Sequence, residues 1–297
     1  GQQVIAKENE NYYGDKPKIK QLTMVFLDTD AAYAAVKSGD VDMASINGDL
    51  AKEEVKGTKI LDIPSIETYG VEFPMVKNTG EKTDSGYEIG NDVTSDEAIR
   101  KALNTAVDRQ GMVDGVLNGY GTPSTTGLEQ MPWEDKSTEL SKDEYANVDE
   151  AKKILADGGW KDSDNDGIVE KDGQKAEFKL LYTEGNYRQE MALEFVNVAK
   201  EIGISVNLEV RTWDTILDDI HKEAVLFGFG SGDPSELYNL YYGPIAGGTV
   251  AWDNAGCYDN KNVNKDIDKA LDATDEKEAL PYWKDLQKYT SAKGDAP

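Results

Sequence analysis

A run of aromatic and polar side chains between residues 229 and 252 offers the groups needed to hold a small molecule. Aromatic rings provide flat apolar walls, and hydroxyl and carboxylate groups can fix the polar ends of a bound compound. The simpler interpretation of the tyrosines in this run is that they cover one face of a helix. The candidate binding residues of this segment are Phe229, Ser231, Asp233, Glu236, Tyr238, Tyr241, Tyr242 and Trp252.

An acidic stretch at residues 162–167 has part of the spacing of a calcium-binding loop. Carboxylates stand at alternate positions and a glycine stands sixth, which suits a loop that wraps a hard cation. The second half of the pattern fails, because position twelve is Gly173, where a bidentate glutamate is wanted. A calcium loop and an exposed turn ahead of a hairpin both stay open. The candidate calcium ligands are Asp162, Asp164, Asp166 and Glu170.

The chain has one histidine and one cysteine, which limits its chemistry. His221 alone cannot build a multi-histidine zinc, nickel or iron site, and we expect it to be solvated or held by a helix end. No histidine lies near Cys257 in sequence, so we expect an inert, packed thiol. The sequence contains no P-loop, serine nucleophile elbow or HExxH element, and no spacing singles out two carboxylates for acid–base work. We predict a protein that is not an enzyme; the alternatives are a secreted carboxylate-dependent hydrolase and an acidic calcium-binding surface module.

Composition and charge narrow the class further. The 297 residues include 38% hydrophobic residues, enough for two packed domains. The chain carries 32 Lys and Arg against 57 Asp and Glu, and the resulting net charge of −25 repels phosphate backbones, which excludes nucleic acid as a partner. We expect no membrane span within these residues, because no run of about 18 apolar residues occurs, and no export leader, because the N-terminus lacks a basic region followed by an apolar stretch.

Strand and helix patterns alternate along the chain, as in an α/β protein. Residues 22–27, 28–37 and 41–46 predict a strand, a helix and a strand, which together would form a βαβ unit. The strand expected at 68–73 would pass between two lobes. Thr94 with Glu97 predicts a capping box at a helix start, and Asn147 with Glu150 predicts another. Later patterns predict strands at 177–183, 205–210 and 223–229, and helices at 187–201, 212–221, 263–273 and 276–289.

Several short motifs follow one another in a characteristic order. The segment Asn11 to Pro17 looks like N-x-Y-[WY]-G-x-x-P, and residues 34–42 match A-x-x-x-G-x-V-D. The helix 99–109, IRKALNTAVDR, is the most specific motif, and residues 119–123, 151–160, 202–206 and 227–234 add further matches. In this order they resemble the peptide- and nickel-binding group of extracellular solute-binding proteins, family 5, which serve oligopeptide-type ABC importers.

The resemblance implies an α/β fold of the type II periplasmic-binding-protein-like kind, with two lobes of which one is incomplete. By this comparison residues 1–68 are a partial lobe I, and residues 69–275 are lobe II, the main ligand-facing lobe. Residues 276–297 are then a helix that begins the return to lobe I. The chain would be a fragment that lacks the N-terminal and extreme C-terminal parts of the family.

The resemblance also implies the function. Such a receptor captures a peptide or other small solute between its lobes and delivers it to the membrane subunits of an ABC importer. We expect a monomer that is extracellular or at the cell surface, either lipid-anchored or periplasmic, with no cofactor besides the candidate calcium.

The resemblance assigns roles to three residues. A family aspartate after the glycine-aromatic turn pairs with a ligand amino group; the turn here is shorter, so Asp233 could instead cap a helix starting at Pro234. Tyr69 either lines the cleft or is buried in its strand. Asn254 matches an N-x-x-x-Y element with a mixed structural and wall role.

Overall fold

The computed structural model describes residues 2–52, 55–128, 131–185 and 187–297. The chain divides into two compact units, residues 1–62 and 63–297. The boundary therefore lies just ahead of the strand at 68–72, whereas the sequence suggested a boundary after residue 68. The C-terminal residues 276–297 belong to the second unit rather than forming a separate segment.

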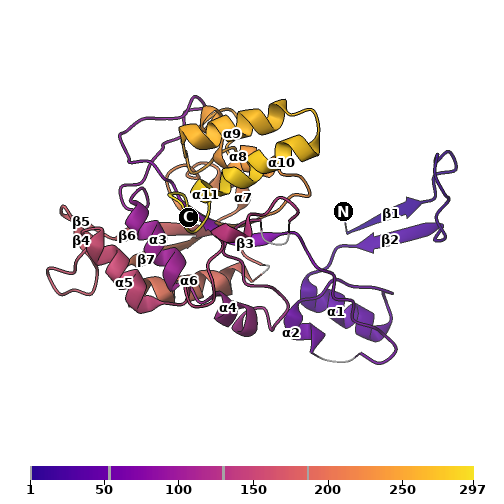
Figure 1. Cartoon of the computed structure of the whole chain (residues 1–297). Coiled ribbons are helices and arrows are strands. Elements are labelled where there is room, and N and C mark those ends of the chain that lie inside the picture. The colour runs from indigo at the N-terminus through magenta and orange to yellow at the C-terminus, as the bar shows by residue number, and fades with distance from the viewer. Residues whose placement is uncertain (1, 53–54, 129–130, 186) are drawn as a thin grey trace. The chain divides into compact units, whose positions relative to one another are not determined.

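The first unit is a two-stranded hairpin followed by two helices (Figure 1). β1 (Gln3–Lys7) pairs antiparallel with β2 (Gln21–Val25), and every residue of both strands is exposed. α1 (Thr29–Ser38) and the short α2 (Gly48–Ala51) follow. The predicted strand at 41–46 is wrong, because within the described residues β1 and β2 pair only with each other and leave it no backbone partner. The predicted βαβ unit therefore does not form.

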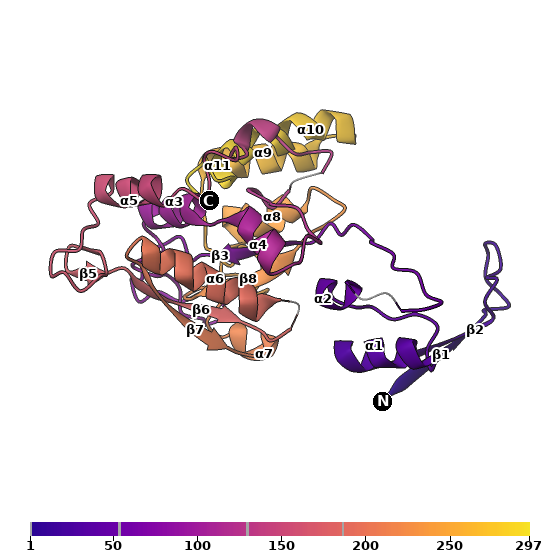
Figure 2. The same ribbon diagram turned by 90° about the horizontal axis from the view of Figure 1, so that it is seen from below.

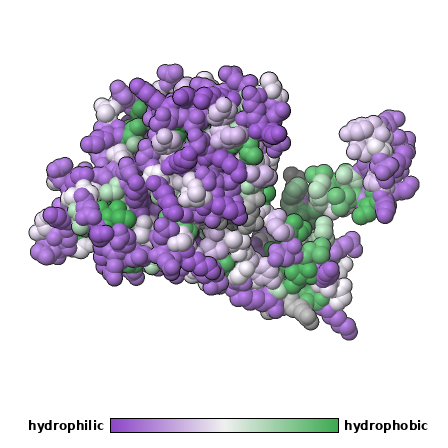
Figure 3. Space-filling view, viewed as in Figure 1, coloured by the Kyte–Doolittle hydropathy of each residue, from purple (hydrophilic) through white to green (hydrophobic). Residues whose placement is uncertain are grey.

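Apolar side chains gather on the surface of the first unit, where Figure 3 shows them in green, while the visible face of the second unit is mainly hydrophilic. A two-stranded hairpin offers too little opposing surface to bury them. The exposed apolar residues of this unit include Val4, Ile5, Tyr13, Ile19, Leu22, Met24, Val25, Phe26, Leu27 and Met43.

A four-stranded sheet organises the second unit. Its strand order is β3-β8-β6-β7, in which β8, β6 and β7 run parallel and β3 runs antiparallel to β8. The strands predicted here are confirmed to within a residue at each end. They are β3 (Thr68–Glu72), β6 (Glu177–Tyr182), β7 (Ser205–Val210) and β8 (Ala224–Phe229).

Both faces of this sheet are buried, which explains why its central strands are apolar at successive positions. Leu180 and Leu226 belong to the core that includes α6 (Arg188–Glu201). Their chain neighbours Leu181, Val225 and Phe227 belong to a second core, under α7 (Trp213–Ile216). Figure 2 shows α6 and α7 on opposite faces of the sheet.

The helix caps test two predictions. α5 (Val148–Asp157) begins after Asn147, whose side-chain oxygen accepts a hydrogen bond from the Glu150 amide at 3.0 Å, as predicted. The cap predicted at Thr94 is wrong: α3 (Glu97–Ala106) begins after Asp96, which accepts from the Ala98 amide. Thr94 is fully buried and donates to the Pro74 carbonyl at 2.7 Å, so its hydroxyl serves tertiary packing instead.

The C-terminal helices build a separate core around Trp283 and Leu286, with α9 (Lys261–Asp272) and α10 (Glu276–Asp285) side by side (Figure 1). No helix in the described part of the chain is both long and apolar enough to cross a membrane. The remaining elements are α4 (Arg109–Gly115), a 3-10 turn at Lys136–Thr138, β4 (Glu170–Lys171), β5 (Gln174–Lys175), α8 (Glu236–Tyr241), a 3-10 turn at Gly243–Ile245 and α11 (Gln287–Thr290).

Candidate functional site

The carboxyl ends of three parallel strands meet at one edge of the sheet. β6 lies between β7 and β8, so the chain leaves β6 toward one side, through α6 to β7, and returns to the other side, through α7 to β8. Connections that diverge in this way leave a crevice at the carboxyl end of the central strand, where ligands of open α/β sheets bind. The loop from β6 to α6 is therefore the first place to look for a site.

Arg188 opens α6 directly after this loop and is 8% exposed. Its guanidinium carbon lies 5.2 Å from the centroid of the Tyr69 ring and 5.2 Å from that of the Trp213 ring. Tyr69 comes from β3 and Trp213 begins α7, so three elements distant in sequence converge here. Such cation–π contacts stabilise a partly desolvated positive charge.

A row of aromatic rings continues from Trp213 across the end of β8. Trp213 meets Trp252 edge-on at 5.4 Å, Trp252 lies 5.6 Å from Phe227, and Phe227 lies 5.3 Å from Phe229. These separations are in the range of favourable aromatic pairs. The row gives the edge of the sheet an apolar wall with one positive charge at its end.

Two glycines let another segment cross this edge. A Cβ atom on Gly228 would lie 2.2 Å from a carboxylate oxygen of Glu67, and one on Gly230 would lie 2.3 Å from the Ile66 carbonyl oxygen. No side chain fits at the second position, because the obstacle is backbone. Phenylalanine and glycine thus alternate over residues 227–230. The two rings extend the aromatic row, and the two glycines leave room for residues 66 and 67 to cross the strand end.

The turn after Gly230 is held by its own side chains. Ser231 accepts a hydrogen bond from the Asp233 amide at 3.1 Å, and Asp233 accepts one from the Ser235 amide at 2.8 Å. The backbone hydrogen bond from Ser235 lowers the pKa of Asp233. α8 starts at Glu236, after Ser235. Asp233 therefore stabilises a local turn, and its exposed carboxylate stays ionised.

Most of the other predicted residues pack around α8. Burial raises the pKa of Glu236, which opens this helix. Tyr238 stacks on Tyr242 at 4.8 Å, and the Tyr242 hydroxyl donates to Asp268 at 2.6 Å, which raises the pKa of Tyr242 to about 12. Tyr241 meets Tyr258 edge-on at 6.0 Å. These tyrosines pack against the C-terminal core.

Asn254 is completely buried and holds a loop closed. Its amide nitrogen donates to the Tyr258 carbonyl at 2.7 Å, and its amide oxygen accepts from the Tyr258 backbone amide at 2.9 Å. Both polar ends of the side chain are thus used within the loop. This geometry accounts for the N-x-x-x-Y spacing as a structural device.

Of the predicted residues, the structure joins Tyr69, Phe229 and Trp252 to one cluster and places the α8 tyrosines and Asn254 in packing roles. Sequence reasoning missed Arg188, Trp213 and Phe227. A signal for Arg188 existed, since it is the arginine that opens the helix after a predicted strand and a glycine turn. That β6 is the central strand, from which the connections diverge to the two sides of the sheet, could be learned only from the strand order.

The single histidine and the single cysteine meet in the core. His221 is fully buried, so the expectation of a solvated side chain is wrong; its Nδ1 lies 2.9 Å from the Ala255 carbonyl and 3.7 Å from Cys257 Sγ. Burial raises the pKa of the Cys257 thiol to about 11 and lowers that of His221. The cysteine is buried, as predicted, and a thiol with this pKa is a poor nucleophile.

The acidic loop brings three candidate calcium ligands together. The carboxylates of Asp162, Asp164 and Asp166 lie within 4.8 Å of one another. The Lys175 ammonium already contacts two of them, at 3.1 Å from Asp164 and closer still to Asp166. Glu170 turns to the Ser163 amide, from which it accepts a hydrogen bond at 2.8 Å. The Lys175 ammonium therefore already neutralises part of the negative charge of the loop.

Calcium is expected to compete poorly with this lysine. In the wild-type protein, millimolar calcium should raise the melting temperature by less than about 1 °C, while Lys175→Met should respond more strongly because two carboxylates lose their counter-ion. Differential scanning calorimetry with and without calcium measures both. A large calcium response in the wild type that Asp164→Ala abolishes would show instead that the loop binds the metal.

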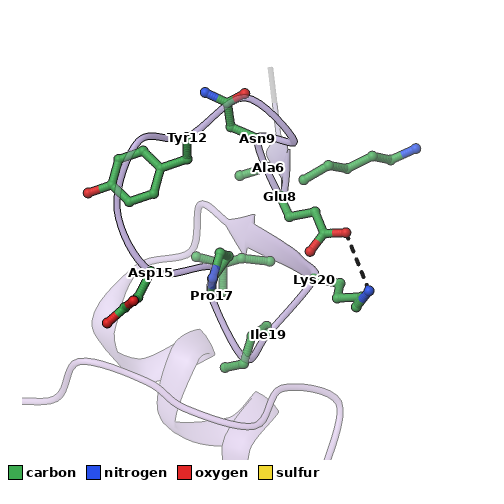
Figure 4. A pocket seen from close by; sticks show the side chains of 10 residues that line it. Ala6, Glu8, Asn9, Tyr12, Asp15, Pro17, Ile19 and Lys20 are labelled. Carbon is green, nitrogen blue, oxygen red and sulfur yellow. Dashed lines mark hydrogen bonds and ion pairs between the residues drawn. The ribbon is translucent and has the colours of Figure 1, made fainter.

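The first unit carries the earliest sequence motif in the connection between β1 and β2. Tyr12, Asp15 and Pro17 line a shallow hollow there, beside the Glu8–Lys20 ion pair at 3.4 Å (Figure 4). The hollow is open, and nearly all the residues that line it are exposed. The motif thus shapes a hairpin loop, and its contacts supply no enclosed site.

Comparison with known proteins gives a consistent result. The family model for bacterial extracellular solute-binding proteins, family 5 Middle, matches residues 1–248. Protein XP55 of Streptomyces lividans is 35% identical over 97% of this chain and 51% of its own length. The oligopeptide-binding protein AppA of Bacillus subtilis is 26% identical over 82% of this chain and 44% of its own length. The chain spans about half the length of these curated relatives.

Solved structures share the fold. NikZ from Campylobacter jejuni, in complex with Ni(L-His), matches all of this chain and 57% of its own with a TM-score of 0.80 and 25% identity. AppA from Bacillus subtilis, in complex with a nonapeptide, matches 99% of this chain and 56% of its own with a TM-score of 0.72 and 23% identity. The fold is thus of the type II periplasmic-binding-protein kind, as predicted. With a family model matched over most of its length and an architecture common to these structures, the chain belongs to the bacterial extracellular solute-binding proteins of family 5.

Proposed function

We propose that this protein is the solute-binding component of an ABC importer, which takes up a peptide or a similar small solute outside the cytoplasm and passes it to the importer's membrane subunits. The observation that supports this most directly is the aromatic row with Arg188 at the carboxyl edge of the sheet. Apolar walls with few fixed polar groups suit a solute that varies in its side chains.

In the proposed mechanism the protein binds the solute and releases it unchanged. The solute lies against the rings of Trp213 and Trp252, and the protein acts as a monomer that presents it to the permease. Binding must favour the transport-competent conformation, since equal affinity for two conformations shifts neither. Membership of this family and the peptide named with the solved AppA structure favour a peptide over other solutes.

Equilibrium dialysis against a pool of random-sequence pentapeptides, followed by mass spectrometry, tests the proposal. The protein should retain intact peptides, and Trp213→Ala should weaken retention by about tenfold because a buried aromatic contact is lost. Tyr120→Ala removes a ring that is 42% exposed elsewhere in the second unit and serves as the matched control. Hydrolysis of the pool would contradict the proposal, as would retention of none of it.

A further inference from the structure

The Phe229 ring at the end of β8 lies between two glycines from other parts of the chain. A Cβ atom on Gly70, in β3, would lie 3.3 Å from Cε1 of this ring. A Cβ atom on Gly127, in the loop 121–128 that follows α4, would lie 2.3 Å from Cε2 and 2.9 Å from Cζ. The two glycines therefore border the ring at opposite edges, and a side chain at position 127 would overlap with it.

Gly127 is required for space rather than for its backbone conformation. Its φ angle lies outside the left-handed region, so an alanine can adopt the same backbone conformation. The obstacle to an alanine is the side chain of Phe229, which the aromatic row holds through Phe227 at 5.3 Å. The position of the loop 121–128 and the position of this ring are therefore linked.

Arg109, the first residue of α4, holds the start of this loop. Its Nε donates to the Ser124 carbonyl at 2.7 Å, and one terminal nitrogen donates to the Asn104 carbonyl at 2.9 Å. The other terminal nitrogen donates to the side-chain oxygen of Asn104. Because a guanidinium is planar and its donors point in fixed directions, these bonds fix Ser124 relative to α3, which contains Asn104.

Hydrogen bonds within the loop continue from Ser124 to Gly127. The Ser124 hydroxyl donates to the Thr126 carbonyl, and the Thr126 hydroxyl accepts from the Leu128 amide at 3.2 Å. Leu128 is itself buried in the C-terminal core. Gly127 thus lies between two anchored neighbours, and it cannot move away from the ring unless these contacts break.

We propose that Arg109 and Gly127 are positioning residues for the solute site. Arg109 fixes the loop 121–128, and Gly127 leaves the space in which the Phe229 ring completes the aromatic row. The inference rests on the proposed function and identifies two residues that act on solute affinity through Phe229. It also gives a role to the most specific motif of the sequence, since Asn104 and Arg109 both belong to residues 99–109.

The test is equilibrium dialysis against the pool of random-sequence pentapeptides, with Gly127→Ala made in two backgrounds. In the wild-type background it should weaken retention about tenfold, because the added Cβ displaces the ring from the row. In the Phe229→Leu background it should weaken retention less than about twofold, because leucine lacks the ring carbons that the Cβ would meet. Gly115→Ala, at the end of α4 with no heavy atom within 4 Å of the added Cβ, is the matched control and should leave retention unchanged.

Arg109→Lys tests the other half of the proposal. Lysine keeps the positive charge but cannot donate to Ser124 and Asn104 in the same fixed geometry. Retention should therefore fall severalfold in the wild-type background and should change less than about twofold in the Phe229→Leu background. Melting temperatures show whether each variant is folded, and the same cycle of melting temperatures without peptide measures the contact between Gly127 and Phe229 directly.

The outcomes separate this inference from the proposed function. An equal loss of retention from Gly127→Ala in both backgrounds overturns the inference, because Gly127 would then serve the fold and not the ring. Unchanged retention in Gly127→Ala or in Phe229→Leu also overturns it and leaves the solute-binding function standing. If the wild-type protein retains none of the pool, the proposed function and the inference fail together.

Discussion

Replacing Gly230 with alanine should lower the free energy of unfolding by about 2 kcal/mol, the usual cost of forcing an atom into packed surroundings. The added Cβ would lie 2.3 Å from the Ile66 carbonyl oxygen and 2.9 Å from the Glu67 Cα atom. Both obstacles are backbone, so the crossing segment must move as a whole. Tyr69 follows that segment in β3, so solute binding should weaken as well. Urea unfolding and peptide dialysis measure the two effects.

Gly232 provides the matched control for this substitution. A Cβ atom at Gly232 would have no heavy atom within 4 Å, although the residue lies in the same turn. Gly232→Ala should therefore change the free energy of unfolding by no more than about 0.5 kcal/mol. Equal effects of the two substitutions would mean that the crossing of residues 66 and 67 over Gly230 does not limit stability.

The second large effect concerns Glu72, the last residue of β3. Its carboxylate accepts a hydrogen bond from the Gly256 amide at 3.0 Å, and burial raises its pKa from 4.5 to about 7. Between these two values the folded protein keeps a proton that the unfolded chain has lost. Stability from this group is therefore complete below pH 4.5, falls as the pH rises toward 7 and then stays level.

Glu72→Gln removes this pH dependence, because the amide is neutral throughout and can still accept from Gly256. The variant should exceed the wild type in free energy of unfolding by about 3 kcal/mol at about pH 8, and the difference should vanish near pH 4.5. Urea unfolding across this range measures it. Glu194→Gln changes an exposed carboxylate of α6 and is the control. A constant difference between Glu72→Gln and the wild type at every pH would contradict a raised pKa.

Local patterns predicted the second unit well. The strand that became β8 is an apolar run, β6 and β7 carry apolar side chains at alternate positions, and α6 and α9 carry regular apolar faces. Asn147 caps its helix because its side chain accepts a hydrogen bond from the Glu150 amide three residues along the chain. Such elements are specified by neighbours in sequence, so the sequence alone suffices for them.

Predictions failed where a distant segment decided the outcome. The Thr94 hydroxyl donates a hydrogen bond to the Pro74 carbonyl, so Asp96 rather than Thr94 caps α3. His221 and Cys257 are separated in sequence yet meet in the core. The same holds for the site: Tyr69, Arg188 and Trp213 converge because β3 begins, and β6 and β7 end, at one edge of a sheet whose strand order the sequence does not state.

The distribution of the five indole side chains has a practical consequence. Trp213 and Trp252 touch each other at the edge of the sheet, while Trp133, Trp160 and Trp283 are enclosed in the cores. Indole emission depends on the polarity of its surroundings. A compound that displaces water from this edge should therefore change the fluorescence of Trp213 and Trp252, while the emission of the three enclosed tryptophans stays constant. Binding could then be titrated by intrinsic fluorescence without a label.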